Sequence, residues 1–227
     1  WMSKTAFFFA GQGAQASGMG KSLYEMGGMA ARVFEMAEKI RPGTMADCFE
    51  ADAERLAQTE VTQPCVFVVD LAAACALFER GVHPDAVAGF SLGELAALAF
   101  AGAFVPAGGR PYTEGEEDTE KNGFARGFTA VCKRAEAMAE AGREKPGSGA
   151  VKGGMCAVLK LADADVEALC KRFTEAGHSG FYPVNYNCPG QLVVAGAAGE
   201  MEEFAAFVKE NGGTARPLPV SGAFHSP

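Results

Sequence analysis

The sequence is poor in basic residues, has only three histidines and contains no long uninterrupted apolar run. Twenty lysines and arginines stand against 28 acidic residues, and the net charge of −8 argues against general nucleic-acid binding, which needs a basic face. The longest apolar stretch, Val66 to Phe78, carries Asp70 and is too short to cross a membrane. The N-terminus has no secretory signal pattern, so we expect neither a membrane segment nor export.

Paired cysteine motifs are also missing. Seven cysteines are present, but none forms a Cys-x-x-Cys pair, and several lie within apolar stretches. This pattern predicts reduced thiols in or near a core, no metal site, no disulfide framework and a cytoplasmic location.

The length of 227 residues and an apolar content of 48% suffice for one large or two small domains. Apolar spacing predicts a buried strand over 5–10, a strand over 87–89, and helices over 30–40, 62–80, 92–101 and 128–141. Residues 106–123 hold glycines, prolines and an acidic run, which indicates a solvated loop.

A second pattern follows a linker at 144–152. Strands are expected over 155–161, 181–186, 192–195 and 215–220, and helices over 163–175, with Asp163 as N-cap, and over 199–212. This β-α-β-β-α-β order is typical of a ferredoxin-like unit. The predicted fold class is therefore α/β. A larger α/β-hydrolase-like domain with a parallel sheet (1–147 and 218–227) is interrupted by a smaller ferredoxin-like α+β domain (148–217).

Ser91 is the most informative residue. It stands in Gly89-Phe90-Ser91-Leu92-Gly93, after a short strand and before a helix. Flanking glycines allow a sharp turn, and the N–H groups at the start of the helix point toward any oxyanion that forms there. The pattern predicts a nucleophilic serine; the alternative is an ordinary glycine-rich connection.

A nucleophilic serine needs a base, and the chain offers three histidines. His83 precedes a proline in a turn, and His178 lies in a loop between glycines and serine, so both are expected to be inert. His225 follows the last predicted strand of the smaller domain, where the chain must return to the larger one. By elimination His225 is the expected base.

The first loop, Gly11 to Ala16, matches the glycine spacing of a dinucleotide site. Such a site also needs an acidic residue at the end of a second strand, but Glu35 falls in an amphipathic helix. We therefore favour the other interpretation, in which backbone N–H groups of this loop face Ser91 as part of an oxyanion hole.

Together these segments resemble the malonyl-CoA:acyl-carrier-protein transacylases, the acyltransferases of fatty-acid and polyketide synthesis. The matching stretches run in family order over nearly the whole chain: FFFAGQGAQASGMG, TQP at 62–64, GFSLGELAAL, KRAEAM at 133–138, NYNCPGQLVVAG at 185–196 and LPVSGAFHSP at 218–227.

The resemblance implies a role for each matching position. Ser91 matches the acylated nucleophile and His225 its general base. Gln12 and Leu92 match the backbone donors of the oxyanion hole. Substrate-binding positions are Arg134, which matches the arginine that grips the malonyl carboxylate, Gln63, which lines the same pocket, and Phe224, which goes with malonyl rather than methylmalonyl use. Residues 185–191 match a stretch near the family's cleft.

The resemblance implies transfer of malonyl from malonyl-CoA to the phosphopantetheine thiol of acyl carrier protein, without a metal or tightly bound cofactor. For the acidic carrier the candidate basic contacts are Lys133, Arg143, Lys145 and Lys152. Two alternatives stay open: a serine esterase or thioesterase of the α/β-hydrolase type, and a non-catalytic remnant.

Three departures from the family pattern stand out. Phe90 replaces the usual histidine, the acidic loop is long, and the family continues beyond the His-Ser-Pro of residues 225–227. We therefore expect the histidine's orienting group to be absent from this chain. We also expect weak activity, and either an oligomer or a second polypeptide that supplies the C-terminal segment.

Overall fold

The chain divides into two compact units, residues 1–137 and 138–227. The computed structural model describes residues 4–105, 122–142, 152–218, 220 and 222–227. The predicted acidic loop and linker lie outside these residues, apart from their last positions. The predicted α/β class is confirmed, since both units combine helices with a sheet.

The first unit contains a two-stranded parallel sheet. Strand β1 (Ala6–Phe9) pairs with β2 (Ala86–Gly89), with Ala6 opposite Ala86 and Phe9 opposite Gly89. Because the strands are parallel, both carboxyl ends lie at the same edge, and they lead into the loop after Phe9 and the turn at Ser91. The helices of this unit are α1 (Lys21–Glu25), α2 (Gly28–Ile40), α3 (Thr44–Phe49), α4 (Ala53–Leu56), α5 (Thr59–Glu79) and α6 (Leu92–Phe100). A further helix, α7 (Gly123–Ala141), continues past the boundary at residue 137.

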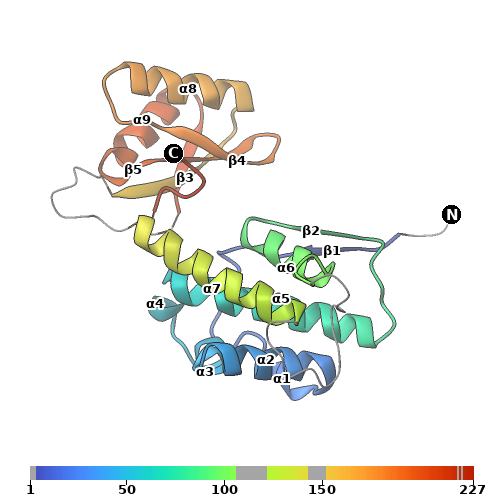
Figure 1. The fold of residues 1–227 in the computed structure, drawn as a ribbon. Coiled ribbons are helices and arrows are strands. Elements are labelled where there is room, and N and C mark those ends of the chain that lie inside the picture. The colour runs from blue at the N-terminus through green and yellow to red at the C-terminus, as the bar shows by residue number, and fades with distance from the viewer. Residues whose placement is uncertain (1–3, 106–121, 143–151, 219, 221) are drawn as a thin grey trace. The chain divides into compact units, whose positions relative to one another are not determined.

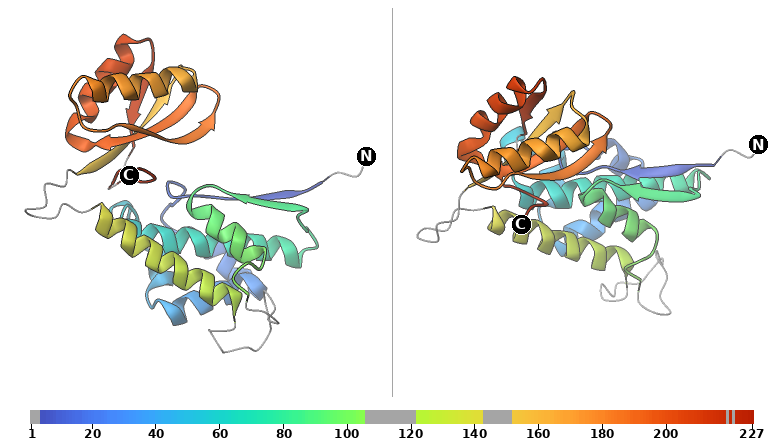
Figure 2. Two further views of the ribbon diagram at one scale, coloured as in Figure 1. Left: turned by 45° about the horizontal axis from the view of Figure 1, so that its top comes forward. Right: turned by 90° about the horizontal axis from the view of Figure 1, so that it is seen from above.

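Helix α5 is the centre of the first unit. Helix α2 packs against one side of α5, and helix α6 with strands β1 and β2 lies on its other side (Figures 1 and 2). Its 21 residues, close to the helix predicted over 62–80, are by length and composition sufficient to cross a membrane, although the apolar run within it was expected to be too short. However, 72% of its apolar window is buried inside the structure, as in the core helix of a globular domain.

Strand β1 differs from the expected buried strand. Phe7 and Phe9 are in the core, whereas the side chain of Phe8 is 82% exposed. Alternate side chains of a strand point to opposite faces, and in the described residues only one face of this sheet is covered by helices.

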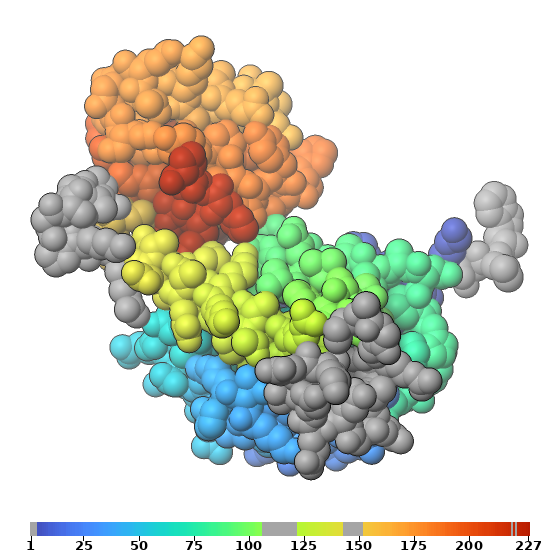
Figure 3. Space-filling view, viewed as in Figure 1, coloured from blue at the N-terminus to red at the C-terminus, as the bar shows by residue number. Residues whose placement is uncertain are grey.

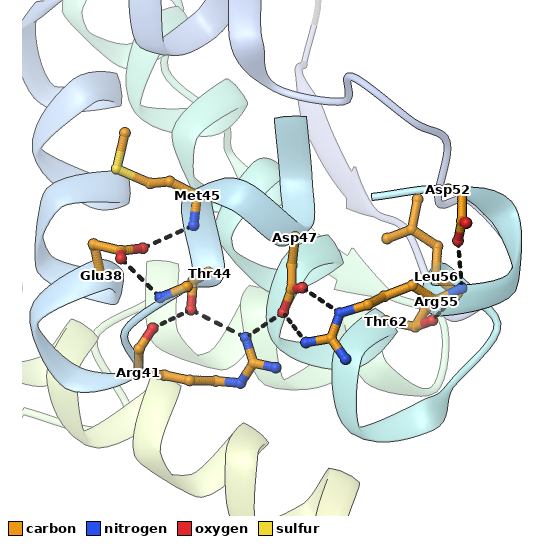
Figure 4. A network of polar contacts seen from close by, with 10 residues as sticks. Glu38, Arg41, Thr44, Met45, Asp47, Asp52, Arg55, Leu56 and Thr62 are labelled. Atoms are coloured by element: carbon orange, nitrogen blue, oxygen red, sulfur yellow. Dashed lines mark hydrogen bonds and ion pairs between the residues drawn. The ribbon is translucent and has the colours of Figure 1, made fainter. Parts of the chain in front are cut away.

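Polar contacts fix the turn between α2 and α4 (Figure 4). Asp47, 6% exposed, accepts hydrogen bonds from Arg41 at 2.9 Å and from Arg55 at 2.7 Å. Glu38 accepts the backbone N–H groups of Gly43 and Met45 at 2.7 and 2.8 Å. A buried carboxylate needs such partners, and here they set the entry into α5.

Helix α7 begins five residues before the predicted start. The side chain of Asn122 accepts the N–H groups of Phe124 and Ala125 at 3.0 and 3.4 Å, which is an N-cap. Two glycines in the first turns, Gly123 and Gly127, obscured the helical pattern in the sequence. The surface of α7 is visible in Figure 3.

The second unit has the β-α-β-β-α-β order expected from the sequence. Its four strands form an antiparallel sheet in the order β4-β5-β3-β6. The elements are β3 (Gly153–Leu159), α8 (Asp163–Glu175), β4 (Tyr182–Cys188), β5 (Gln191–Ala197), a 3-10 turn η1 (Ala198–Glu200), α9 (Met201–Glu210) and β6 (Thr214–Pro217).

The two faces of this sheet are covered differently. Helices α8 and α9 cover one face, around Phe173, Phe181 and Phe204. On the other face Leu218, Val220, Ala223 and Phe224 pack against Met155, Ala157, Val193 and Ala195. The segment that leads to His225 is thus anchored on the sheet.

The expected N-cap of α8 was wrong by one residue. Ala162 is extended, with φ −71° and ψ 153°, and is the N-cap, whereas Asp163 is already helical. Its carboxylate therefore lies in the first turn, where the helix dipole favours a negative charge.

Candidate active site

Ser91 lies at a strained turn between β2 and α6. Its φ of 52° and ψ of −101° fall in a region that residues other than glycine rarely adopt. Among the described residues only Ser91, Lys160 and His225 combine a side chain with positive φ. Two of these three are the nucleophile and base predicted from the sequence, and backbone strain is concentrated at functional sites.

Glycines allow the elements around Ser91 to meet. A Cβ on Gly89 would lie 2.0 Å from the backbone of Gly93, and one on Gly93 would lie 2.2 Å from the carbonyl oxygen of Phe9. The start of α6 therefore packs directly on the ends of both strands. The G-x-S-x-G spacing is required by this contact, as well as by the turn itself.

Arg134 contacts the serine directly. It comes from α7, whose Lys133 and Glu136 face solvent while Arg134 is half-buried. Its Nη2 donates to Ser91 Oγ at 3.2 Å, and its Nη1 donates to Gln63 Oε1 at 2.7 Å. Burial lowers the pKa of Arg134, and the nearby Glu94 opposes this effect. An arginine stays charged under such a shift, so a fixed cation lies beside the serine hydroxyl.

The hydrogen bonds continue from Arg134 into the first loop. Gln63, fully buried on α5, donates from Nε2 to Gln12 Oε1 at 3.3 Å. Gln12 in turn donates from Nε2 to Thr59 Oγ1 at 3.3 Å. Each amide receives a hydrogen bond on its oxygen and gives one from its nitrogen, so the guanidinium orients both glutamines. The structure thus brings Ser91, Arg134, Gln63 and Gln12 into one chain of contacts.

The first loop and the serine turn are also in backbone contact. A Cβ on Gly11 would lie 2.5 Å from the carbonyl oxygen of Phe90, and the N–H of Phe90 donates to the Phe9 carbonyl at 3.1 Å. Leu92 is the first residue of α6, so its N–H has no acceptor within the helix. Gln12 and Leu92 therefore lie in two adjoining segments beside Ser91.

His225 and Phe224 lie in the second unit. Phe224 is half-buried on the open face of the sheet, and His225 is exposed, with φ 63°. A Cβ on Gly153 would lie 2.4 Å from the backbone nitrogen of Ala223, which shows how closely the segment lies on β3. The hydroxyl of Ser226 donates to the Ala223 carbonyl at 2.5 Å and closes the turn around His225.

The other two histidines have packing roles. His83 makes an edge contact with Phe78 at 4.3 Å between ring centroids. His178 stacks on Phe173 at 3.9 Å and lies 3.7 Å from Glu200.

The described part of the chain has no cluster of three or more histidine, cysteine or acidic side chains placed to hold a metal, and its cysteines form no disulfide bond. Residues 185–191 form the end of β4 and the turn into β5.

Phe90 is 48% exposed and lies beside Ser91 in the sequence. Its phenyl ring offers no polar group to the serine hydroxyl from the position where the family usually has a histidine.

Two residues of this region were not predicted from the sequence. Thr59 accepts the hydrogen bond from the side chain of Gln12, and Asp70 on α5 has a buried Oδ2 atom that accepts no hydrogen bond within the described part of the chain. Asp70 stands out in the sequence as the single charge within an apolar run, but its surroundings in the fold cannot be predicted from that position alone.

Comparison with known proteins agrees with this geometry. Residues 6–110 match the acyl transferase domain family. The chain is 37% identical to the malonyl CoA-acyl carrier protein transacylase of Bacillus subtilis, over 99% of the chain and 64% of that protein. A transacylase structure from Clostridium perfringens superposes with a TM-score of 0.80 at 32% identity, covering 98% of this chain and 63% of that one.

A second structure, of a malonyl-transacylase in complex with its type II polyketide acyl-carrier protein, superposes with a TM-score of 0.79 at 28% identity. It covers 97% of this chain and 64% of that one. The chain thus spans just under two thirds of the length of these relatives.

Proposed function

The chain is related over nearly its whole length to the malonyl CoA-acyl carrier protein transacylases, and we propose that it works as one. It transfers malonyl from malonyl-CoA to the phosphopantetheine thiol of an acyl carrier protein, in fatty-acid or polyketide synthesis. The observation that carries the proposal is the hydrogen bond between Arg134 and Ser91. A fixed cation beside a strained nucleophile suits a carboxylate-bearing acyl group.

The first half-reaction forms an acyl-enzyme. His225 takes the proton of Ser91 as the Oγ atom attacks the thioester carbonyl, and the Gln12 and Leu92 N–H groups stabilise the tetrahedral oxyanion. The C–S bond then breaks, and coenzyme A leaves with the proton held by His225. The carrier thiol reverses these steps on malonyl-Ser91.

Arg134 has two partners in succession in this scheme. In the free protein its guanidinium favours negative charge on Ser91 Oγ, because a donated hydrogen bond stabilises the ionised form. Once malonyl is attached, the guanidinium binds the carboxylate while Gln63 keeps it in place. A hydrolase of neutral esters has no use for this half-buried cation, which argues against the esterase alternative.

Finer features of the fold belong to the same proposal. The parallel strands with the serine turn suit an α/β-hydrolase-like larger domain, although Leu218, Val220 and Phe224, which the sequence assigned to that domain, pack on the sheet of the second unit. The strand order β4-β5-β3-β6 suits a ferredoxin-like smaller domain at 148–217. Cysteines without disulfide bonds suit a cytoplasmic protein. Lys133 and Lys152, both exposed, are candidate contacts for the acidic carrier.

A mass measurement after mixing with malonyl-CoA tests the function. We expect a covalent malonyl adduct on the peptide that contains Ser91, and discharge of that adduct by a carrier-protein thiol. Ser91→Ala should form no adduct, whereas Ser22→Ala, which changes an exposed serine on α1, should form it normally. An adduct that persists in Ser91→Ala, or that water removes as fast as it forms, would overturn the proposal.

A further inference from the structure

Two side chains of helix α5, Thr59 and Gln63, hold the side chain of Gln12 in the first loop. The Nε2 of Gln12 donates to Thr59 Oγ1 at 3.3 Å, and its Oε1 accepts from Gln63 Nε2 at 3.3 Å. Thr59 and Gln63 are four residues apart and so lie on the same face of α5. They are 1% and 0% exposed, so their polar groups need partners inside the protein.

Arg134 fixes the direction of these hydrogen bonds. A guanidinium only donates, so the carboxamide oxygen of Gln63 faces Arg134 and its NH₂ group faces Gln12. The oxygen of Gln12 therefore faces Gln63, and its NH₂ group faces Thr59. Position 59 must supply an acceptor, and an apolar side chain there would take this acceptor from the Gln12 amide.

We propose that Thr59 is a positioning residue: by fixing the Gln12 side chain, it holds the backbone N–H of Gln12 where the oxyanion forms. The proposal rests on the proposed function for its catalytic consequence. Gln12 directly follows Gly11, where an added Cβ would lie 2.5 Å from the carbonyl oxygen of Phe90, so the loop touches the serine turn next to this N–H. An oxyanion donor acts only when it lies within hydrogen-bond distance of the developing charge.

Two substitutions of Thr59 separate positioning from simple packing. Thr59→Val keeps the shape of the side chain but removes the acceptor, whereas Thr59→Ser keeps the acceptor and loses a methyl group. We expect Thr59→Val to slow malonylation of Ser91 about 5- to 50-fold with little change in KM, part of what losing an oxyanion donor outright costs. Thr59→Ser should recover the parent rate to within about threefold, because the hydroxyl still accepts the hydrogen bond.

A double-variant test asks whether Thr59 acts through Gln12. Gln12→Met removes the carboxamide but keeps the backbone N–H, and it breaks the same contact from the side of the loop, so it should slow malonylation at least as much as Thr59→Val. Adding Thr59→Val to Gln12→Met should change the rate no further, because the contact is already lost. Losses that multiply in the double variant would contradict the proposal.

The side-chain amide of Gln12 supplies a readout that needs no turnover. Solvent exchange of its NH₂ protons can be followed by NMR in isotope-labelled protein, with the signal assigned by its loss in Gln12→Met. Thr59→Val should exchange these protons faster, while Thr59→Ser, and the amide of Gln191 in the second unit, should be unchanged.

Slower malonylation of Thr59→Val together with unaltered exchange of the Gln12 amide would overturn the proposal, as would equal malonylation rates in Thr59→Val and the parent. If the parent itself forms no adduct, the proposed function fails, and the exchange data still decide whether Thr59 holds Gln12.

Discussion

Replacing Asp70 by asparagine should stabilise the first unit, and the gain should depend on pH. The pKa of the Asp70 carboxyl is raised by burial to about 7 in the folded protein. In an unfolded chain the pKa of an aspartate is about 3.9. The folded state therefore binds this proton more tightly, and the free energy of unfolding falls as pH rises from about 4 to about 7. Above that range the loss is complete.

The size follows from the difference of about three pKa units. Each unit is worth about 1.4 kcal/mol, which gives an upper value of about 4 kcal/mol. Asp70 is half-buried, so solvent screening lowers this value, and we expect the variant to be about 2–4 kcal/mol more stable than the parent at pH 8. Near pH 4 both side chains are neutral, and the difference should fall to about zero.

Hydrogen exchange of α5 peptides in rising urea measures this quantity, because it reports on the first unit alone and does not assume that both units unfold together. The parent and Asp70→Asn are compared at several values between pH 4.5 and 8. Asp165→Asn, an exposed aspartate in the first turn of α8, is the control. A stability difference that is the same at both ends of the pH range, or a less stable variant at pH 8, would refute the reasoning.

Three further predictions concern packing and specificity. Gly93→Ala places a methyl group 2.2 Å from the Phe9 carbonyl oxygen, so it should lower the melting temperature or prevent folding. Scanning calorimetry measures this, and an unchanged melting temperature would contradict the close packing. Arg134→Ala should reduce malonyl transfer far more than acetyl transfer, since losing one partner of a sheltered charged pair costs about 2–5 kcal/mol. Equal losses in assays with the two acyl groups would show that Arg134 does not bind the malonyl carboxylate. Phe224→Ser should raise the ratio of methylmalonyl to malonyl transfer in a competition assay, by an amount equivalent to the ~1–3 kcal/mol that one methyl group contributes to discrimination. An unchanged ratio would show that Phe224 does not select between the two acyl groups.

Local patterns in the sequence were enough for most of the elements. Apolar spacing predicted α2, α5, α6 and the order of strands and helices in the second unit. The repeat of apolar residues that distinguishes a helix from a strand depends only on residues close together in the sequence. The glycines around Ser91 predicted the turn, because only glycine fits where backbones nearly touch. Errors arose where local signals compete. Asn122 starts α7 despite two glycines, and Asp163 follows the cap instead of forming it.

The arrangement around the serine was decided by tertiary structure. Arg134 and Ser91 are 43 positions apart in the sequence, Arg134 and Gln63 are 71 apart, and Gln63 and Gln12 are 51 apart. Family resemblance named these four residues, but no spacing rule links them or reveals that Thr59 joins them by accepting a hydrogen bond from Gln12. Asp70 interrupts an apolar run in the sequence, and only the fold buries its carboxyl and raises its pKa. Residue type and period are local properties, whereas burial and hydrogen-bond partners depend on which segments the fold brings together.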